Sequence, residues 1–102
     1  MYPIFRWSGA YFGFVLTGSL YDRKARYLGW VSDGVVWNAD GTYLGQLYDG
    51  SYVLVNTAKP PLPPQTPRSS PLEPSVPAPW SDRSARTQLL AFEDALDLFS
   101  ND

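Results

Sequence analysis

The chain has 102 residues, of which 44% are apolar and 16% aromatic, and its formal net charge is −2. This length suits one small domain, and the slightly acidic balance argues against a general nucleic-acid binder. Because the sequence has no cysteine and no histidine, it excludes disulfide bonds and thiolate or imidazole metal ligands, and it predicts neither a metal site nor a cofactor.

Prolines divide the chain into three parts. Nine of the ten lie between residues 60 and 79, which separates a body (1–56) from a Pro-rich linker (57–80) and a tail (81–102). No segment approaches the roughly 20 apolar residues that a membrane span needs, and the short apolar run at 9–18 lacks a cleavage site of the small-x-small type. We therefore expect a soluble cytoplasmic protein that does not contact membranes.

The body repeats itself every sixteen residues. The repeated features are the Tyr-x-Gly triplets at 11–13, 27–29 and 43–45 and the turn pairs Thr17-Gly18, Asp33-Gly34 and Asp49-Gly50. Ahead of each triplet a similar match relates Ile4-Phe5 to Leu20-Tyr21, Val36-Trp37 and Tyr52-Val53. The repeat thus gives three units, near 5–20, 21–36 and 37–52, and a partial fourth at 53–56.

Each unit is predicted to be one β-hairpin. Asp-Gly between short β-branched and aromatic runs is the strongest local signal for a type I′ turn, in which both central residues have positive φ. A glycine in the centre of a strand indicates close approach of another backbone. We therefore predict an all-β meander of about seven short strands, with its hairpins crowded around a common pseudo-symmetry axis.

Three segments carry a resemblance to a known family: FRWSGAYFGFVLTG, YDRKARYLGWVSDG and WNADGTYLGQLYDG. They resemble the repeats of the small bacterial four-fold β-flower domain, in which short hairpins surround a pseudo-four-fold axis. The resemblance implies that fold and no activity, because the family has none assigned. Two departures are that Ala25 replaces the turn glycine of the second copy and that the fourth copy stops after SYVLVN, which leaves the closure of the flower open.

The charged residues of the body are predicted to shape turns. Aspartate at a turn bonds its own backbone and tolerates left-handed geometry, and this applies to Asp22, Asp33, Asp40 and Asp49. A small basic cluster on one turn is expected to be solvated, and it consists of Arg23, Lys24 and Arg26. No catalytic constellation is present, and we expect a protein that is not an enzyme.

The repeat aromatics offer a possible ligand site. Tyrosine suits a half-buried strand position, but a ring of aromatic side chains could also stack a sugar or enclose a quaternary ammonium. The candidates are Tyr11, Tyr27, Tyr43, Trp30 and Trp37. Residues 35–54 are also similar to the aromatic-glycine hairpins of choline-binding cell-wall modules, so the alternative function is a small-ligand or carbohydrate/choline-binding module.

The linker is expected to be an extended polyproline spacer with no core of its own. The tail, in contrast, places apolar residues at helical spacing after a possible cap at Ser81, which predicts one amphipathic helix of roughly 16 residues. Its docking surface could be the body, a second copy of the chain or a groove on another protein.

The sequence thus favours a non-enzymatic protein-interaction or scaffold module. The C-terminal helix would be its partner-binding or self-docking element, through a protein partner or a homo-oligomer. The residues expected to make this contact are Trp80, Leu89, Phe92, Leu96 and Phe99.

Overall fold

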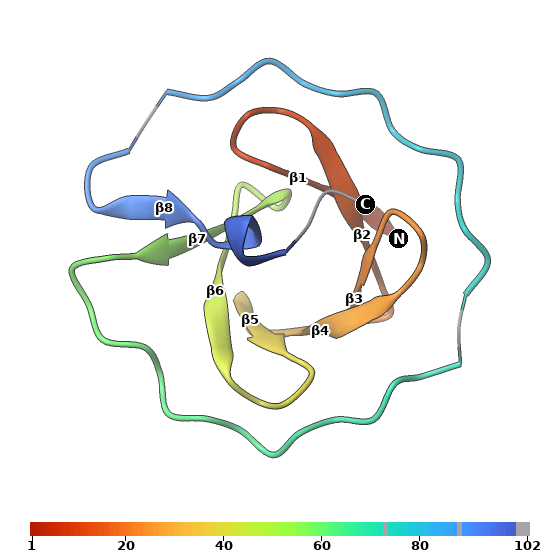
Figure 1. The fold of residues 1–102 in the computed structure, drawn as a ribbon, viewed down its shortest axis with the longest axis horizontal. Helices are drawn as coiled ribbons and strands as arrows, with labels where there is room; N and C mark the ends of the chain where they lie inside the picture. The colour runs from red at the N-terminus through yellow and green to blue at the C-terminus, as the bar shows by residue number, and fades with distance from the viewer. Residues whose placement is uncertain (73, 88, 100–102) are drawn as a thin grey trace.

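One antiparallel sheet of eight strands, in sequence order, forms the molecule (Figure 1). The computed structural model describes residues 1–72, 74–87 and 89–99. Its elements are β1 (Tyr2–Phe5), β2 (Tyr11–Leu16), β3 (Ser19–Asp22), β4 (Tyr27–Ser32), β5 (Val35–Asn38), β6 (Tyr43–Tyr48), β7 (Tyr52–Asn56), β8 (Phe92–Asp94) and a 3₁₀ helix η1 (Ala95–Leu98). The predicted all-β meander is confirmed, and the tail supplies an eighth strand.

The turns between the repeat units have the predicted geometry. Thr17 and Gly18 have φ of 50° and 79°, and Asp33 and Gly34 have φ of 52° and 78°. Positive φ at both central residues is the mark of a type I′ turn. The twist of such turns matches the twist of the strands they join, so consecutive units continue the sheet without a break.

The third turn departs from the sixteen-residue period. Tyr48 pairs with Tyr52, so this turn holds three residues, whereas Ser32 pairs with Val35 around a two-residue turn. The extra residue is Ser51, and it moves β7 by one position relative to the repeat. The sixteen-residue alignment matched Tyr52 with Ile4, Leu20 and Val36, and this match is wrong. Val53 is the residue of β7 that packs with these three.

An aliphatic cluster fills the centre of the sheet. The first strand of each hairpin contributes one residue that is at most 1% exposed, namely Ile4, Leu20, Val36 and Val53. The hairpins are arranged around these residues. We call the whole cluster, which also includes Leu96, the axial core. Beside it the first and last hairpins meet, because the Phe5 N–H donates to the Ser51 carbonyl at 2.7 Å.

The strand glycines allow this crowding. A Cβ atom added to Gly13 would overlap the carbonyl oxygen of Tyr21, and one added to Gly29 would overlap that of Trp37. Any side chain at these positions would push the neighbouring strand away. The predicted close backbone approach at the Tyr-x-Gly glycines is thus confirmed.

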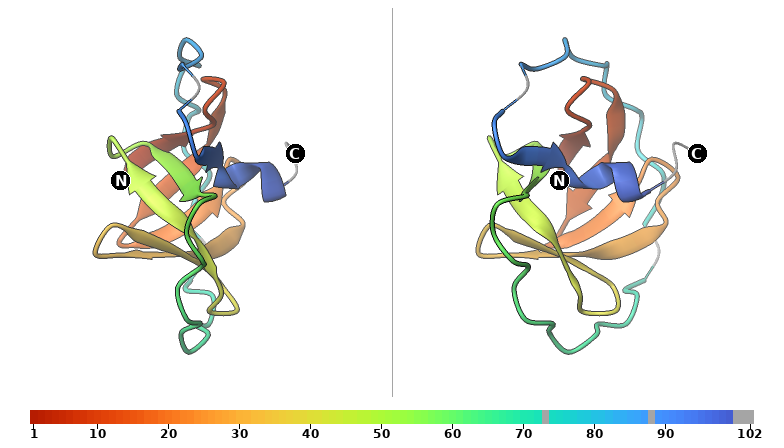
Figure 2. Two further views of the ribbon diagram at one scale, coloured as in Figure 1. Left: turned by 90° about the vertical axis from the view of Figure 1, so that its left-hand side faces the viewer. Right: turned by 60° about the vertical axis from the view of Figure 1, so that its left-hand side comes forward.

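The linker and the following residues form a belt, which we define as residues 57–91. Its described residues run around the outside of the sheet (Figure 1), and the edge-on view of Figure 2 shows them close to one plane. The molecule is a disc of 37 × 34 × 22 Å. As predicted for the linker, residues 57–72 and 74–80 have no helix or strand, but the belt does not hold the tail away from the body.

Backbone hydrogen bonds fix the belt to the tips of the hairpins. The Gln65 N–H donates to the Gly41 carbonyl at 2.7 Å, and the Arg83 N–H donates to the Gly9 carbonyl at the same distance. These glycines have φ of 92° and 97°, and an added Cβ would overlap the belt backbone. A glycine at these tips therefore serves both the turn and the passage of the belt.

The tail completes a fourth hairpin. Strand β8 pairs with β7 in the register Leu54↔Asp94, Val55↔Glu93 and Asn56↔Phe92, so the belt is a long insertion into the loop of this hairpin. The question that the partial fourth repeat left open is answered, because residues distant in sequence close the flower.

The predicted amphipathic helix over 81–102 is wrong for the described part of the tail. Residues 81–87 and 89–91 form no helix, and only η1 makes a single 3₁₀ turn. The open edge of β7 offers unpaired backbone groups that a helix could not satisfy. Asp94 then caps η1 by accepting from the Leu96 N–H at 3.0 Å. Residues 88 and 100–102 lie outside the described residues.

Leu96 lies in the axial core and is 0% exposed. Replacing it by alanine is expected to lower the free energy of unfolding by about 2–5 kcal/mol, because the truncation leaves a cavity. Urea unfolding followed by tryptophan fluorescence measures this loss.

Leu90 is the matched control, because it belongs to the same segment of the chain and is 95% exposed. Leu90→Ala should change the free energy of unfolding by less than about 0.5 kcal/mol. Equal effects of the two variants would contradict the burial of Leu96.

Candidate functional site

The residues expected to bind a partner lie where the C-terminal segment meets the body. Leu96 is part of the axial core, and the Phe99 ring lies 5.8 Å from the Phe12 ring. Trp80 is half-buried and packs on Tyr11, with 5.7 Å between ring centroids. The structure thus seats these three residues on the protein's own body.

Leu89 and Phe92 line an open cleft beside this contact. The cleft has a volume of about 490 Å³ and is also lined by Arg6, Trp7 and Asp94. Both apolar residues are half-buried. The cleft lies between β8 and the turn of the first hairpin, so its shape depends on the tail being docked.

Arg6 fastens the end of the tail. It is only 8% exposed, and its guanidinium donates to the carbonyls of Leu96 at 3.0 Å and Phe99 at 3.1 Å. The same group stacks on the Phe12 ring at 5.1 Å. Cationic donors at the last carbonyls of a helical turn stabilise it, so Arg6 ties η1 to the first hairpin.

Sequence reasoning missed Arg6, although the repeat held a signal. By the sixteen-residue spacing, Arg6 stands where the other units have Asp22 and Asn38. At this position the side chains of Asp22 and Asn38 bond within their own turns, so a cation here indicates that the partner has changed from the local turn to another segment.

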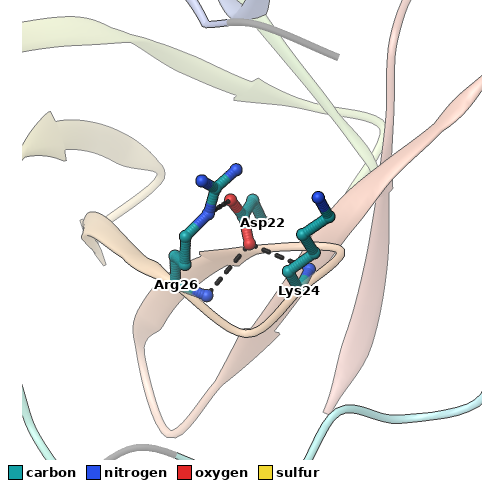
Figure 3. A network of polar contacts seen from close by, with 3 residues as sticks. All are labelled: Asp22, Lys24 and Arg26. Carbon is teal, nitrogen blue, oxygen red and sulfur yellow. Dashed lines mark hydrogen bonds and ion pairs between the residues drawn. The ribbon is translucent and has the colours of Figure 1, made fainter. Parts of the chain in front are cut away.

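Asp22 shows the usual role of this position (Figure 3). Its carboxylate accepts from the backbone N–H groups of Lys24 and Arg26, each at 2.9 Å, and pairs with the Arg26 guanidinium at 2.6 Å. Asp40 similarly accepts from the N–H and the hydroxyl of Thr42. The turn interpretation of these aspartates is confirmed. Arg26 serves the turn, so the basic cluster is not a patch of three free charges.

The structure does not bring the three repeat tyrosines together. Each packs nearly edge-on against the aromatic residue that faces it on its own hairpin. The pairs are Phe5–Tyr11 at 6.1 Å, Tyr21–Tyr27 at 6.1 Å and Trp37–Tyr43 at 5.9 Å. The axis, around which the alternative function would place an aromatic ring, is filled by the axial core, whose buried members are aliphatic apart from Phe12.

Trp30 and Trp37 do lie together. Their rings stack with 6.4 Å between centroids and 23° between planes. Arg68 of the belt covers Trp30, with the guanidinium carbon 4.5 Å from the ring centroid. The belt therefore occupies one side of this candidate site.

The arginines of the belt were not predicted as contacts. Like Arg68 on Trp30, Arg83 lies over Phe5 at 4.0 Å, and Arg86 lies over Trp7 at 4.9 Å. The available signal was the spacing of arginines along a segment that is otherwise rich in proline, opposite a body rich in aromatic residues. Cation–π contacts of this kind stabilise by about 0.5–2 kcal/mol each.

The family model for the 4-fold beta flower protein matches residues 2–89, which includes the first three hairpins, β7 and nearly all of the belt. The chain belongs to this family. No curated protein and no solved structure matches it. The predicted family is confirmed, and the match extends beyond the body into the belt.

The described residues also bear on two other classes of site. No helix in residues 1–72, 74–87 and 89–99 is long and apolar enough to cross a membrane. Within the same ranges, no three acidic side chains of the β-flower gather as they would to hold a metal ion.

The Tyr11 hydroxyl is buried and has no hydrogen-bond partner among the described residues. Tyr11→Phe is therefore expected to leave the free energy of unfolding unchanged or to raise it by about 1–3 kcal/mol, because it removes a buried unsatisfied group. Urea unfolding of Tyr43→Phe, whose ring is half-buried, is the matched control and should show a smaller change. A loss of more than about 1 kcal/mol in Tyr11→Phe would contradict this expectation.

Burial raises the pKa of Tyr11, Tyr27 and Tyr43 above the ordinary value of 10.0. Because the folded state disfavours the tyrosinate, the neutral phenols contribute stability below about pH 10, and this contribution is lost as the pH rises through the folded pKa. Tyrosinate absorbance should therefore develop at higher pH in the native protein than in urea. Coincident titration curves would contradict the burial of these hydroxyls.

Proposed function

We propose that this β-flower is a non-enzymatic protein-interaction or scaffold module, and that its docking element is the C-terminal segment 92–99. The docked position described above is the resting state, and the same segment seats on a second copy of the chain when two molecules exchange tails. The observation that supports this most is Leu96, a fully buried residue of the axial core that reaches its site through an exposed belt.

The geometry of the connection favours exchange. Residues 57–72 of the belt are all exposed, and the seat of the tail is the open edge of β7 together with the axial core. A segment that docks in its own chain makes identical contacts in a second copy. The equilibrium between the monomer and the tail-exchanged dimer therefore depends on the connecting segment and on protein concentration.

The non-enzymatic part of the proposal rests on what the acidic side chains already do. Asp82 accepts from the Tyr11 N–H at 2.8 Å, and Asp94 accepts from the Trp7 N–H at the same distance. Asp22 closes its own turn. These three carboxylates hold backbone in place, which is a structural role for groups that could otherwise serve in acid–base chemistry.

Engineered cysteines test tail exchange, because the natural chain has none. Val55 of β7 and Glu93 of β8 are paired in register, and directly paired strand residues are within the range that a disulfide spans. Val55→Cys and Glu93→Cys are made as two separate variants, mixed, unfolded and refolded together, and oxidised. We expect a covalent heterodimer on a non-reducing gel.

Two controls complete the test. The variant that carries both cysteines should form an intramolecular cross-link, which reports the docked tail within one chain. A mixture of Val55→Cys with Leu90→Cys places the second thiol on an exposed, unpaired residue and reports random collision. If the Val55/Glu93 mixture gives no more heterodimer than this control, tail exchange is wrong.

A further inference from the structure

Three aromatic side chains form a cage on the rim of the disc. The Trp7 ring lies 5.6 Å from the Tyr48 ring and 5.1 Å from the Tyr52 ring, with interplanar angles of 69° and 75°. They come from the first hairpin turn and from both sides of the β6–β7 turn. None of these residues was singled out in the sequence as a candidate site. We call them, together with Asp49, the rim cage.

The side chain of Arg86 fills the rim cage. Its guanidinium carbon lies 4.9, 5.1 and 5.8 Å from the ring centroids of Trp7, Tyr52 and Tyr48. Its Nη1 atom pairs with the Asp49 carboxylate at 3.1 Å. The cage therefore presents aromatic surface and a negative charge to a single cation.

Arg86 makes more side-chain contacts with the body than are needed to hold the belt in place. Arg68 reaches the body through one ring, Trp30. The path of the belt at residue 86 is also set by its backbone, because the Arg86 N–H donates to the Trp7 carbonyl at 3.0 Å and the Arg83 N–H donates to the Gly9 carbonyl at 2.7 Å. The side chain of Arg86 can thus leave while these backbone bonds remain.

The rim cage is open to the solvent on one side. The side chains of Asp49 and Arg86 are 60% and 36% exposed, and Tyr48 is 36% exposed, whereas Tyr52 forms the buried floor at 3%. An incoming side chain could reach the rings from the exposed side without unfolding the sheet.

We infer that the rim cage is a binding site for an alkylguanidinium group, the arginine side chain of a peptide from a partner protein, and that Arg86 is its built-in competitor. Guanidinium is flat, weakly hydrated and rich in N–H donors, so it stacks on aromatic faces and pairs with a carboxylate at the same time. A quaternary ammonium has no N–H to donate to Asp49, which makes arginine the better match. The rings and Asp49 lie outside segment 92–99, and the docked tail supports the cage because Asp94 accepts from the Trp7 N–H at 2.8 Å.

The test removes the competitor. Full-length Arg86→Ala is titrated with a blocked arginine, N-acetyl-arginine methylamide, while the Trp7 indole N–H is followed by NMR. We expect a saturable shift with a dissociation constant on the order of millimolar, as suits one side chain in one small site. The wild-type protein should bind at least about tenfold more weakly, because Arg86 is held next to the cage at a high effective concentration.

Blocked citrulline is the matched control ligand, because it has the shape of arginine without the charge. It should not shift the Trp7 signal, and Asp49→Asn added to Arg86→Ala should weaken arginine binding about tenfold. If arginine gives no shift, or if citrulline shifts the signal equally, the inference is wrong and Arg86 only packs on the rim.

The fold of each variant is checked by its amide spectrum. Should Arg86→Ala not fold, Arg86→Gln is titrated in its place, because its aliphatic stem still covers Trp7 while the positive charge is gone. The same two ligands then decide the outcome.

Discussion

The pairing of β8 with the edge of β7 is the contact on which the rest of the molecule depends. Three hairpins curl around the axial core, but the fourth has only its first strand within the repeat region. Strand β8 satisfies the open backbone edge, and Leu96 fills the axis directly after it. The belt is inserted into the loop of this hairpin: it leaves β7 at Asn56, runs around the disc and returns to Phe92, which pairs with Asn56.

Arginine has two different roles in this arrangement. Arg6 lies inside and holds the carbonyls of Leu96 and Phe99, whereas Arg68, Arg83 and Arg86 lie on the rim and stack on aromatic faces. A body of under 60 residues buries little surface. Through these contacts the proline-rich belt, which has no core of its own, stabilises the body. The body and the belt are therefore one folding unit, although their compositions differ sharply.

The local features of the fold could be predicted from the sequence. Type I′ turns, short strands and close approach at Gly13 and Gly29 follow from residues adjacent in the chain. The tail could not be predicted in this way, because Phe92, Leu96 and Phe99 have helical spacing and only the distant edge of β7 makes part of the segment a strand. The register of β7 could not be predicted either. Asp49-Gly50 resembles the earlier two-residue turns, but Ser51 makes this turn one residue longer and shifts the strand. The rim cage brings Trp7 to residues of the distant 48–52 turn, so no local pattern in the sequence predicts it.

The distance along the chain between the two strands of the last hairpin has a consequence for biosynthesis. Residues 52–56 leave the ribosome well before residues 92–94, so the edge of β7 stays unpaired until β8 has been made. Closing so long a loop costs conformational entropy before any contact offsets it. The exposed edge of a nascent chain is also the feature by which neighbouring chains pair wrongly. Expression yield and refolding rate should consequently respond to changes in residues 92–99 more strongly than to changes in any comparable stretch of the belt.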